Sequence, residues 1–272
     1  MDKIGEYIRR IEIDSLWSGQ KHIVWELDRK VNILSGVNGV GKSTILNKVI
    51  LRLLQAVKEG CPAKPDVKLT YEPADAVTVR FDVVRSFDRP LVHSNLLEKL
   101  ADDRVATELD WQLYLLQRRF LDYQVNVGNR MIALLTSGDP EAREKAQAAA
   151  QARVQFQDMV DELFSETGKK IVRSSNEIQL EQFGEVLSPY KLSSGEKQML
   201  VILLTVLVED RQPYVLFMDE PEISLHVEWQ QKLITLIRQL NPNVQIILTT
   251  HSPAMIMNGW MDAVTEVTDI TQ

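Results

Sequence analysis

Apolar and polar residues alternate in short runs through much of the N-terminal part of the chain. The alternation predicts strands at Tyr7–Ile13, Ile23–Leu27, Val31–Leu34 and Ala76–Val84. Between the last two, apolar residues recur every fourth position over Thr44–Glu59, which is typical of a helix with one buried face. A glycine-rich segment joins this helix to the strand before it, so the pattern predicts a strand, loop and helix in succession.

A helical period replaces the alternation over residues 95–168. A second helix is expected to start near Asp139, with Asp139 as its cap and Pro140 in its first turn. Large apolar residues occupy more than one face of the first helix. These are Trp111, Leu115, Leu116 and Phe120. They either pack against each other within a helical lobe or form a surface that binds a partner protein.

The C-terminal part alternates buried strands with helices. Tyr214–Met218 and Val244–Leu248 are almost entirely apolar, and a helix is predicted between them at Glu228–Leu240. Another buried helix is predicted at Lys197–Glu209. This order indicates an α/β fold whose sheet is covered on both faces. We expect an N-terminal half at 1–94, a helical subdomain at 95–168 and a C-terminal half at 169–272.

Composition and charge exclude several classes of protein and of site. The 272 residues are 44% hydrophobic and 25% charged, which is a globular composition. The net charge is −7, so the chain lacks the overall basic excess of a constitutive nucleic-acid binder. Cys61 is the only cysteine, which excludes an intrachain disulfide and a cysteine-built zinc site. The N-terminus lacks an apolar signal segment and the longest apolar run, Met199–Val208, is too short to span a membrane, so we expect a cytoplasmic protein.

The segment Gly36-Val37-Asn38-Gly39-Val40-Gly41-Lys42-Ser43 fits the phosphate-binding pattern G-x-x-x-x-G-K-[ST]. Glycines let successive backbone N–H groups face phosphate oxygens, the lysine adds a positive charge, and the serine hydroxyl can bind Mg²⁺. ATP and Mg²⁺ are the expected ligands. The expected nucleotide-binding residues of this loop are Gly36, Asn38, Gly39, Gly41, Lys42, Ser43 and Thr44.

Two carboxylates end the strand predicted at Tyr214–Met218. Both can reach a site beyond the carboxyl edge of the sheet, although strand side chains alternate between faces. We expect Asp219, together with Ser43, to hold Mg²⁺, and Glu220 to polarise the attacking water.

Ser193-Ser194-Gly195-Glu196 opens the buried helix that precedes this strand. Ser193 and Glu196 match a capping box, which would start a helix in any protein. A Ser-Ser-Gly sequence at a helix N-terminus can also bind an anion. On these residues alone the cap is the favoured interpretation.

Two histidines follow the acidic strand. His251 comes after Val244–Leu248 and is expected to lie where the terminal phosphate of a nucleotide would sit, in a catalytic role. His226 either contributes to catalysis or simply begins the next helix.

Together these motifs resemble the ABC-type ATPases of the AAA family, in the order in which that family carries them. The motif sequences resemble those of the non-transporter branch, the SMC, RecF and OLD-like proteins, more closely than those of transporter subunits. Leu-Ser-Ser-Gly-Glu-Lys-Gln, Glu-Pro-Glu-Ile-Ser-Leu-His and Thr-Thr-His-Ser-Pro carry the likeness. The resemblance implies a P-loop ATPase with a mixed central sheet, an N-terminal antiparallel β subdomain and a helical lobe. It also implies that Ser193, Ser194 and Gly195 of one subunit complete the nucleotide site of another.

The resemblance further implies a glutamine that senses Mg²⁺ and an aromatic residue that stacks on adenine. Gln112, Gln117 and Gln124 are all candidates for the first role. Trp17 or Trp25 could fill the second, although core packing is the expected role of both.

The favoured hypothesis is a Mg²⁺-dependent ATPase switch. It would form an ATP-dependent homodimer or a higher oligomer and control a separately encoded effector, such as a nuclease, as similar small ATPases of phage-defence systems do. One alternative is the nucleotide-binding subunit of an ABC transporter. Another is a RecF-like DNA binder whose dimer builds a basic groove from Arg9, Arg10, Lys21, Arg29 and Lys30.

Overall fold

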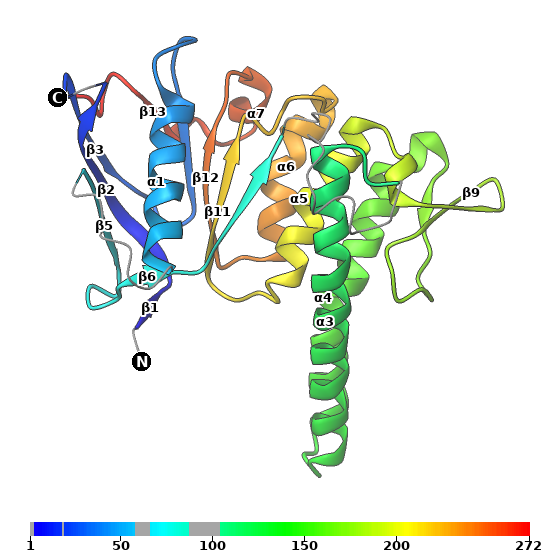
Figure 1. The fold of residues 1–272 in the computed structure, drawn as a ribbon. Helices are drawn as coiled ribbons and strands as arrows, with labels where there is room; N and C mark the ends of the chain where they lie inside the picture. Colours follow the sequence, from blue (N-terminus) through cyan, green and yellow to red (C-terminus); the bar gives the residue numbers. More distant parts are fainter. Residues whose placement is uncertain (1–2, 18, 58–65, 87–103) are drawn as a thin grey trace.

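The computed structural model describes residues 3–17, 19–57, 66–86 and 104–272 (Figure 1). Its centre is a five-stranded sheet in the order β13-β4-β12-β11-β7. The strands are β4 (Val31–Ser35), β7 (Phe81–Arg85), β11 (Tyr214–Asp219), β12 (Val244–Thr249) and β13 (Val264–Glu266). All four neighbouring pairs are parallel, so the carboxyl ends of these strands meet at one edge.

Antiparallel strands form two small sheets in the described part of the chain, and an isolated antiparallel bridge joins Ile23 to Thr271. In the first, β2 (Tyr7–Leu16) lies between β3 (Lys21–Glu26) and β5 (Val67–Glu72). The second consists of β8 (Lys170–Ile171), β9 (Leu180–Gln182) and β10 (Glu185–Leu187). A short parallel pair joins β1 (Ile4–Gly5) to β6 (Thr78–Val79). The predicted α/β class with an antiparallel N-terminal part is thus confirmed, and the central sheet itself is parallel.

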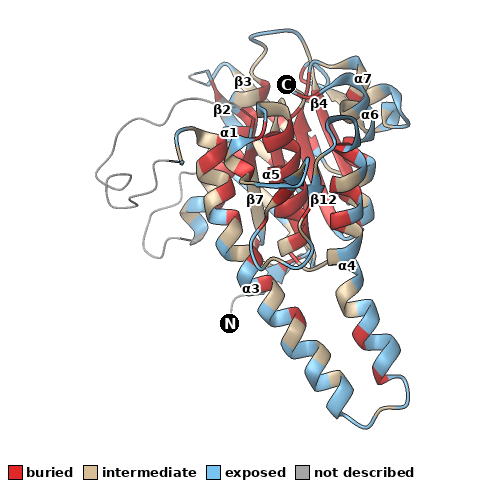
Figure 2. Cartoon of the chain, turned by 90° about the vertical axis from the view of Figure 1, so that its right-hand side faces the viewer, coloured by how far each residue is buried: buried red, intermediate tan, exposed pale blue. Residues whose placement is uncertain are grey.

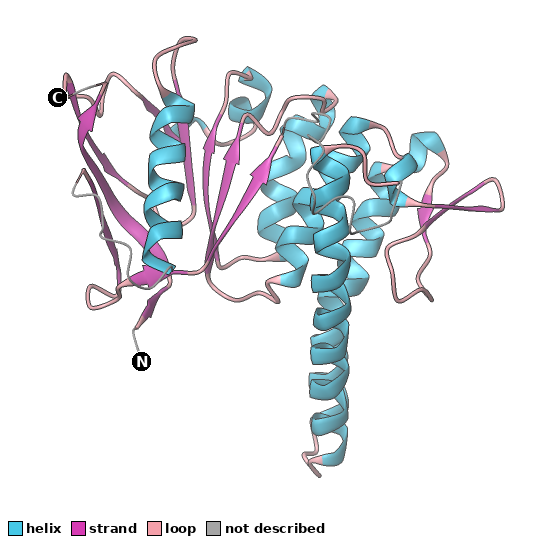
Figure 3. Cartoon of the chain, in the orientation of Figure 1, coloured by secondary structure: helices cyan, strands magenta, loops and turns pink. Residues whose placement is uncertain are grey.

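Helices cover the two faces of the central sheet separately (Figure 3). On one face α1 (Lys42–Val57) packs in a core cluster with Val215 and Phe217 of β11. On the other face α5 (Ser194–Val208) and α6 (Val227–Leu240) pack with Leu216 and Met218. Alternate side chains of β11 therefore serve two cores, as the period of a strand requires. The helix after the glycine loop and the helix after Ser193 lie on opposite faces of the sheet.

The helix α5 is buried all round from Met199 to Val206, because it is enclosed by the sheet and by other helices. It starts at Ser194, directly after the predicted cap at Ser193 and three residues before the start predicted at Lys197. The remaining short elements are α7 (Pro253–Met257), η1 (Ser165–Thr167), η2 (Pro189–Lys191) and η3 (Met261–Ala263). No helix within the described ranges is both long and apolar enough to cross a membrane.

Two long helices, α3 (Glu108–Thr136) and α4 (Ala142–Leu163), form a hairpin whose far end projects from the body (Figures 1 and 2). A capping box between Thr107 and Asp110 starts α3. The predicted cap of the second helix is wrong: α4 begins at Ala142, and the Asp139 carboxylate instead accepts a hydrogen bond from the Glu141 N–H in the turn before it.

The four large apolar residues singled out on the first helix fall into different environments. Leu116 and Phe120 are buried in the core, so they cannot form a partner surface. Trp111 stacks on Tyr114 with ring centroids 5.6 Å apart, and Leu115 is exposed. The N-terminal part of the segment 95–168, residues 95–103, lies outside the described residues.

Candidate nucleotide-binding site

The glycine loop between β4 and α1 adopts backbone angles that favour glycine. Gly36, Gly39 and Gly41 have φ values of 148°, 79° and 102°. A Cβ on Gly41 would lie 2.5 Å from the Trp17 ring, so a larger residue does not fit there. The tip of the loop, Val37 to Gly39, is exposed to solvent. A loop of this shape can present its backbone N–H groups to phosphate oxygens.

Lys42 lies beneath this loop and is almost fully buried. Its ammonium donates to the Gly36 carbonyl at 3.0 Å and lies 2.6 Å from Nε2 of His251. Burial lowers the pKa of Lys42 from its usual value, and three nearby carboxylates oppose that shift, namely those of Glu220, Asp219 and Glu222. The Lys42 ammonium is therefore outnumbered by nearby carboxylates. This excess of negative charge disfavours the binding of a polyphosphate unless a second cation binds with it.

Ser43 and Asp219 come together from different elements. The Ser43 hydroxyl, in the first turn of α1, donates to Asp219 Oδ1 at 2.9 Å at the end of β11. Thr249, at the end of β12, also donates its hydroxyl to this carboxylate oxygen. A hydroxyl and a carboxylate are oxygen ligands of the kind that Mg²⁺ prefers, so these residues fit the ion.

Glu220 leaves the strand in a left-handed conformation. Its φ is 47°, which is uncommon for a residue with a side chain and costs of order 1–3 kcal/mol. Its backbone N–H donates to the carbonyl and to the hydroxyl of Thr249, both at 3.1 Å. The bend places the Glu220 carboxylate 3.3 Å from Nε2 of His251, next to Lys42. Asp219 and Glu220 thus face the same edge of the sheet although they are adjacent in the chain.

Glu222 has a role that its position in the sequence did not suggest. Its Oε1 accepts hydrogen bonds from the Thr250 hydroxyl at 2.6 Å, the His251 N–H at 2.8 Å and the Ser252 N–H at 3.2 Å. The carboxylate therefore fixes the turn that presents His251. Its partners lie 28 to 30 residues away in the chain, so sequence spacing gave no signal for this contact.

The turn at Ser193 has the predicted capping box. The Ser193 hydroxyl accepts from the Glu196 N–H, and a Glu196 carboxylate oxygen accepts from the Ser193 N–H at 3.0 Å. Burial raises the pKa of Glu196, but hydrogen bonds from Lys169 and Ser193 lower it by more, so the pKa lies below its usual value. A Cβ on Gly195 would lie 2.4 Å from the Ser224 carbonyl oxygen, so glycine lets this turn pack on the loop after Glu220.

The structure therefore brings most of the predicted site residues together and sets one group apart. Gly36, Gly41, Lys42, Ser43, Asp219, Glu220 and His251 surround one place at the carboxyl edge of the sheet. Asn38, Gly39 and Thr44 belong to the same loop and helix start and are exposed. Ser193, Ser194 and Gly195 begin α5, on the other face of the sheet.

Geometry also separates the residues that the sequence left open. Gln112 exchanges two hydrogen bonds with the backbone of Arg85, which pairs with Asp219 across neighbouring strands. Gln117 and Gln124 instead bind the backbone near β9. Gln112 is thus the candidate next to the acidic strand.

The structure also distinguishes the two candidate tryptophans and shows where His226 lies. Trp25 is buried in the core, whereas Trp17 is 39% exposed and lies against Gly41 of the glycine loop. The exposed His226 contributes its carbonyl to the start of α6, accepting from the N–H groups of Trp229 and Gln230.

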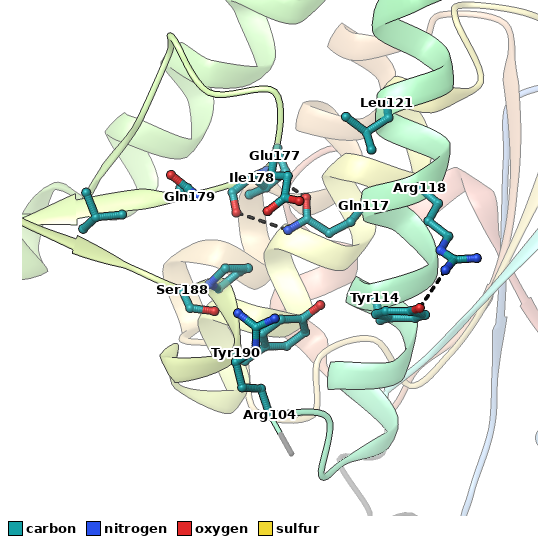
Figure 4. A pocket seen from close by; sticks show the side chains of 12 residues that line it. Arg104, Tyr114, Gln117, Arg118, Leu121, Glu177, Ile178, Gln179, Ser188 and Tyr190 are labelled. Carbon is teal, nitrogen blue, oxygen red and sulfur yellow. Dashed lines mark hydrogen bonds between the residues drawn. The ribbon is translucent and has the colours of Figure 1, made fainter. Parts of the chain in front are cut away.

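A separate hollow of about 400 Å³ lies between α3, the segment 177–179 before β9 and the segment 186–190 (Figure 4). Gln117 crosses it to make two hydrogen bonds with the backbone of Ile178, and Arg118 donates to the Tyr114 hydroxyl. None of the residues from the glycine loop or the acidic strand lines it. It is therefore distinct from the candidate nucleotide site.

The fold and the arranged motifs define a P-loop ATPase of ABC-like type. The chain belongs to the family described as "AAA domain, putative AbiEii toxin, Type IV TA system", which matches residues 72–257. That match includes the signature turn, the acidic strand and His251, and it begins after the glycine loop. The chain is thus an ATP-binding ABC-like ATPase of the AAA family.

Several known proteins resemble parts of this chain. The Septu protein PtuA of Bacillus thuringiensis is 35% identical over 106 residues, which are 34% of this chain and 24% of that protein. The Retron Vc95 probable ATPase of Vibrio cholerae serotype O1 biovar El Tor is 34% identical over 84 residues, 27% of this chain and 16% of that protein. The chain thus spans less than a quarter of either relative's length in these matches.

Two further likenesses extend over most of the chain. The phosphate import ATP-binding protein PstB of Thermococcus kodakarensis is 24% identical over 252 residues, covering 88% of this chain and 79% of PstB. The crystal structure of an SMC head bound to the C-winged helix domain of ScpA covers 93% of this chain and 91% of its own, with 14% identity and a TM-score of 0.51. The second likeness concerns the fold alone.

Proposed function

We propose that this protein is an ATP-driven switch in which two chains bind ATP head to tail. The glycine loop of one chain and the Ser193–Gly195 turn of the other would enclose each nucleotide. The observation that carries this proposal is the placement of α1 and α5 on opposite faces of one sheet. A turn suited to anions and a glycine loop so placed cannot both surround one phosphate group within a chain, whereas a two-fold arrangement lets each complete the other.

The chain's own residues have separate parts in the proposed hydrolysis. Lys42 and the loop N–H groups bind the phosphate oxygens of ATP, and the turn of the second chain closes over the terminal phosphate. Glu220 accepts a proton from the water that attacks that phosphate, and ADP leaves. Glu222 holds the His251 turn in place beside it. Mg²⁺, held by Ser43 and Asp219 when bound, offsets negative charge on the phosphate oxygens.

Nucleotide binding is expected to require a divalent cation. Asp219, Glu220 and Glu222 all act electrostatically on the ammonium of Lys42, so ATP alone would add negative charge to an acidic site. Titration calorimetry should give weaker ATP binding in EDTA than in Mg²⁺, by about tenfold or more. Equal affinities in both buffers would show that Ser43 and Asp219 hold no metal. The exposed Asp262 lies outside the site, so an Asp262→Asn protein should show the same dependence on Mg²⁺ as wild type.

Dimerisation should depend on ATP and on the signature turn. A Glu220→Gln variant, which binds ATP but turns it over slowly, is expected to increase in mass in light scattering when ATP and Mg²⁺ are added. Adding Ser194→Arg should prevent the change by filling the anion site, whereas Ser174→Arg, at an exposed serine elsewhere, should not. A Glu220→Gln protein that binds ATP and shows no increase in mass would contradict the proposal.

We further propose that this switch controls a separately encoded effector. The likeness to PtuA and to retron ATPases supports such a role in phage defence. The likeness to PstB over most of the chain supports the transport alternative. Co-purification with the product of the neighbouring gene separates them, since an effector enzyme supports the first and a membrane permease the second.

The DNA-binding alternative has less support from the described contacts. Arg10 is paired with Glu12 and Glu26, and Arg29 with Glu6. Two of the five residues suggested for a basic groove are thus already neutralised by acids of the same sheet region.

A further inference from the structure

The long helix α3 carries two apolar seams. The buried seam alternates steps of four and three residues along Leu109, Leu113, Leu116, Phe120, Tyr123 and Val127. A second seam repeats the same steps on another face along Leu121, Val125, Gly128, Ile132 and Leu135. Its large residues are exposed, at 37%, 61%, 62% and 57% respectively. One seam is sufficient to pack a helix on its own protein, so a second seam of coiled-coil spacing suits another helix.

The charges around this seam are also unlike those of a solvated helix. Residues 121–135, which span the seam, contain two charged side chains, Asp122 and Arg130, and Arg130 is paired with Asp210 of the body. The outward positions of α4 are by contrast charged, with Arg143, Glu144 and Lys145 in one turn. Figure 2 shows the far part of the hairpin extending away from the body, and Leu121, at the other end of the seam, lines the hollow beside residues 186–190. An exposed apolar surface with so few charges is typical of an interaction site.

The spacing of the seam favours a second copy of the same helix. Leu121 and Leu135 each lie seven residues from Gly128, and Val125 and Ile132 lie three and four residues from it. An antiparallel pair of α3 helices crossing at Gly128 would set Leu121 opposite Leu135 and Val125 opposite Ile132. The chain carries a net charge of −7, so two copies meet most favourably where each is neutral.

Gly128 supports the same arrangement. A glycine inside a helix costs about 0.5–1 kcal/mol relative to alanine, and nothing in the described structure lies within 4 Å of where its Cβ would be. The packing of the single chain therefore does not need a glycine at this position. A small residue at the crossing point of two helices allows their backbones to approach closely.

We propose that the exposed seam of α3 pairs antiparallel with the same seam of a second chain, about a two-fold axis at Gly128. This contact needs no nucleotide and lies on a different surface from the head-to-tail interface. Two such interfaces on one chain would join chains into assemblies larger than a dimer when ATP is present.

Cysteine cross-linking without nucleotide tests the contact and its direction. In a Cys61→Ser background, Gly128→Cys should form a disulfide-linked dimer under mild oxidation with copper phenanthroline, because the two-fold axis brings residue 128 close to itself. Leu121→Cys and Leu135→Cys should each remain uncross-linked alone and cross-link when mixed. Self-linking of Leu121→Cys would indicate a parallel pair and overturn the proposal, as would the absence of cross-linking at Gly128→Cys.

A mass measurement gives an independent readout. Without ATP, the wild-type protein is expected to be a dimer in light scattering, and Ile132→Asp should convert it to a monomer that still binds ATP. Gln147→Asp, on the exposed face of α4, should leave the dimer intact. A wild-type protein that is monomeric without ATP at micromolar concentration would refute the contact and leave the proposed ATP-dependent dimer untouched.

Discussion

Replacing Glu220 by glutamine should lower ATP turnover by about 10²- to 10⁴-fold and leave ATP binding intact, since this is the usual contribution of a positioned general base. The carboxylate lies 3.3 Å from His251 and is directed there by a left-handed backbone. Glutamine keeps the size of the side chain but cannot accept the proton of the attacking water. Phosphate release at saturating ATP measures the loss, and calorimetry measures the binding.

Two further variants serve as comparisons for the Glu220→Gln protein. Glu228→Gln changes an exposed acid of the neighbouring helix and should turn over ATP at the wild-type rate. Lys42→Ala removes the cation under the glycine loop and should abolish ATP binding itself, so the two steps separate cleanly. If the Glu220→Gln protein hydrolyses ATP as fast as wild type, the base is a different residue.

Glu222→Ala should lower turnover by about 10²-fold, because a displacement of about 1 Å in a positioned group can cost that much. The carboxylate holds the His251 turn through three hydrogen bonds to one oxygen. Its other oxygen is buried without a hydrogen-bond partner among the described residues. Glu222→Gln would bury an unpaired N–H₂ there, at about 1–3 kcal/mol, so we expect only partial rescue.

The role of Glu222 is tested by comparing the changes in kcat and in KM. Loss of positioning should reduce kcat more than it changes KM, because Glu222 does not touch the glycine loop in the structure. Thermal unfolding of each variant establishes that it is folded, and Glu228→Ala serves as the exposed control. An unchanged kcat in a folded Glu222→Ala protein would show that Glu222 does not position the His251 turn for catalysis.

The sequence predicted the sheet because its strands are unusually regular. Tyr214–Met218 and Val244–Leu248 are apolar throughout, as a strand covered on both faces must be, and both are paired as expected. The start of α4 could not be read in the same way. Asp139 and Pro140 satisfy the general rule for a helix start, yet the turn uses the Asp139 carboxylate for the Glu141 N–H and delays the helix to Ala142.

The candidate site was predictable where one local motif supplies the chemistry, as in the glycine loop and the acidic strand. It was not predictable where the contact depends on tertiary structure. Glu222 meets donors that follow a different strand, and Trp17 lies against Gly41 across a gap of 24 residues in sequence. Trp17 also shows why an expectation of core packing can fail, because it follows directly on a β-strand yet is 39% exposed beside the loop.

The composite site is tested most directly by mixing two inactive variants. Lys42→Ala lacks a working glycine loop but keeps its signature turn, and Ser194→Arg has the reverse defect. Mixed in equal amounts, they should recover up to about half of wild-type ATPase activity, because neither variant forms an ATP-bound dimer with itself and each mixed dimer has one intact site out of two. A mixture no more active than its separate components, from variants shown to be folded, would contradict the proposal that ATP is bound between two chains.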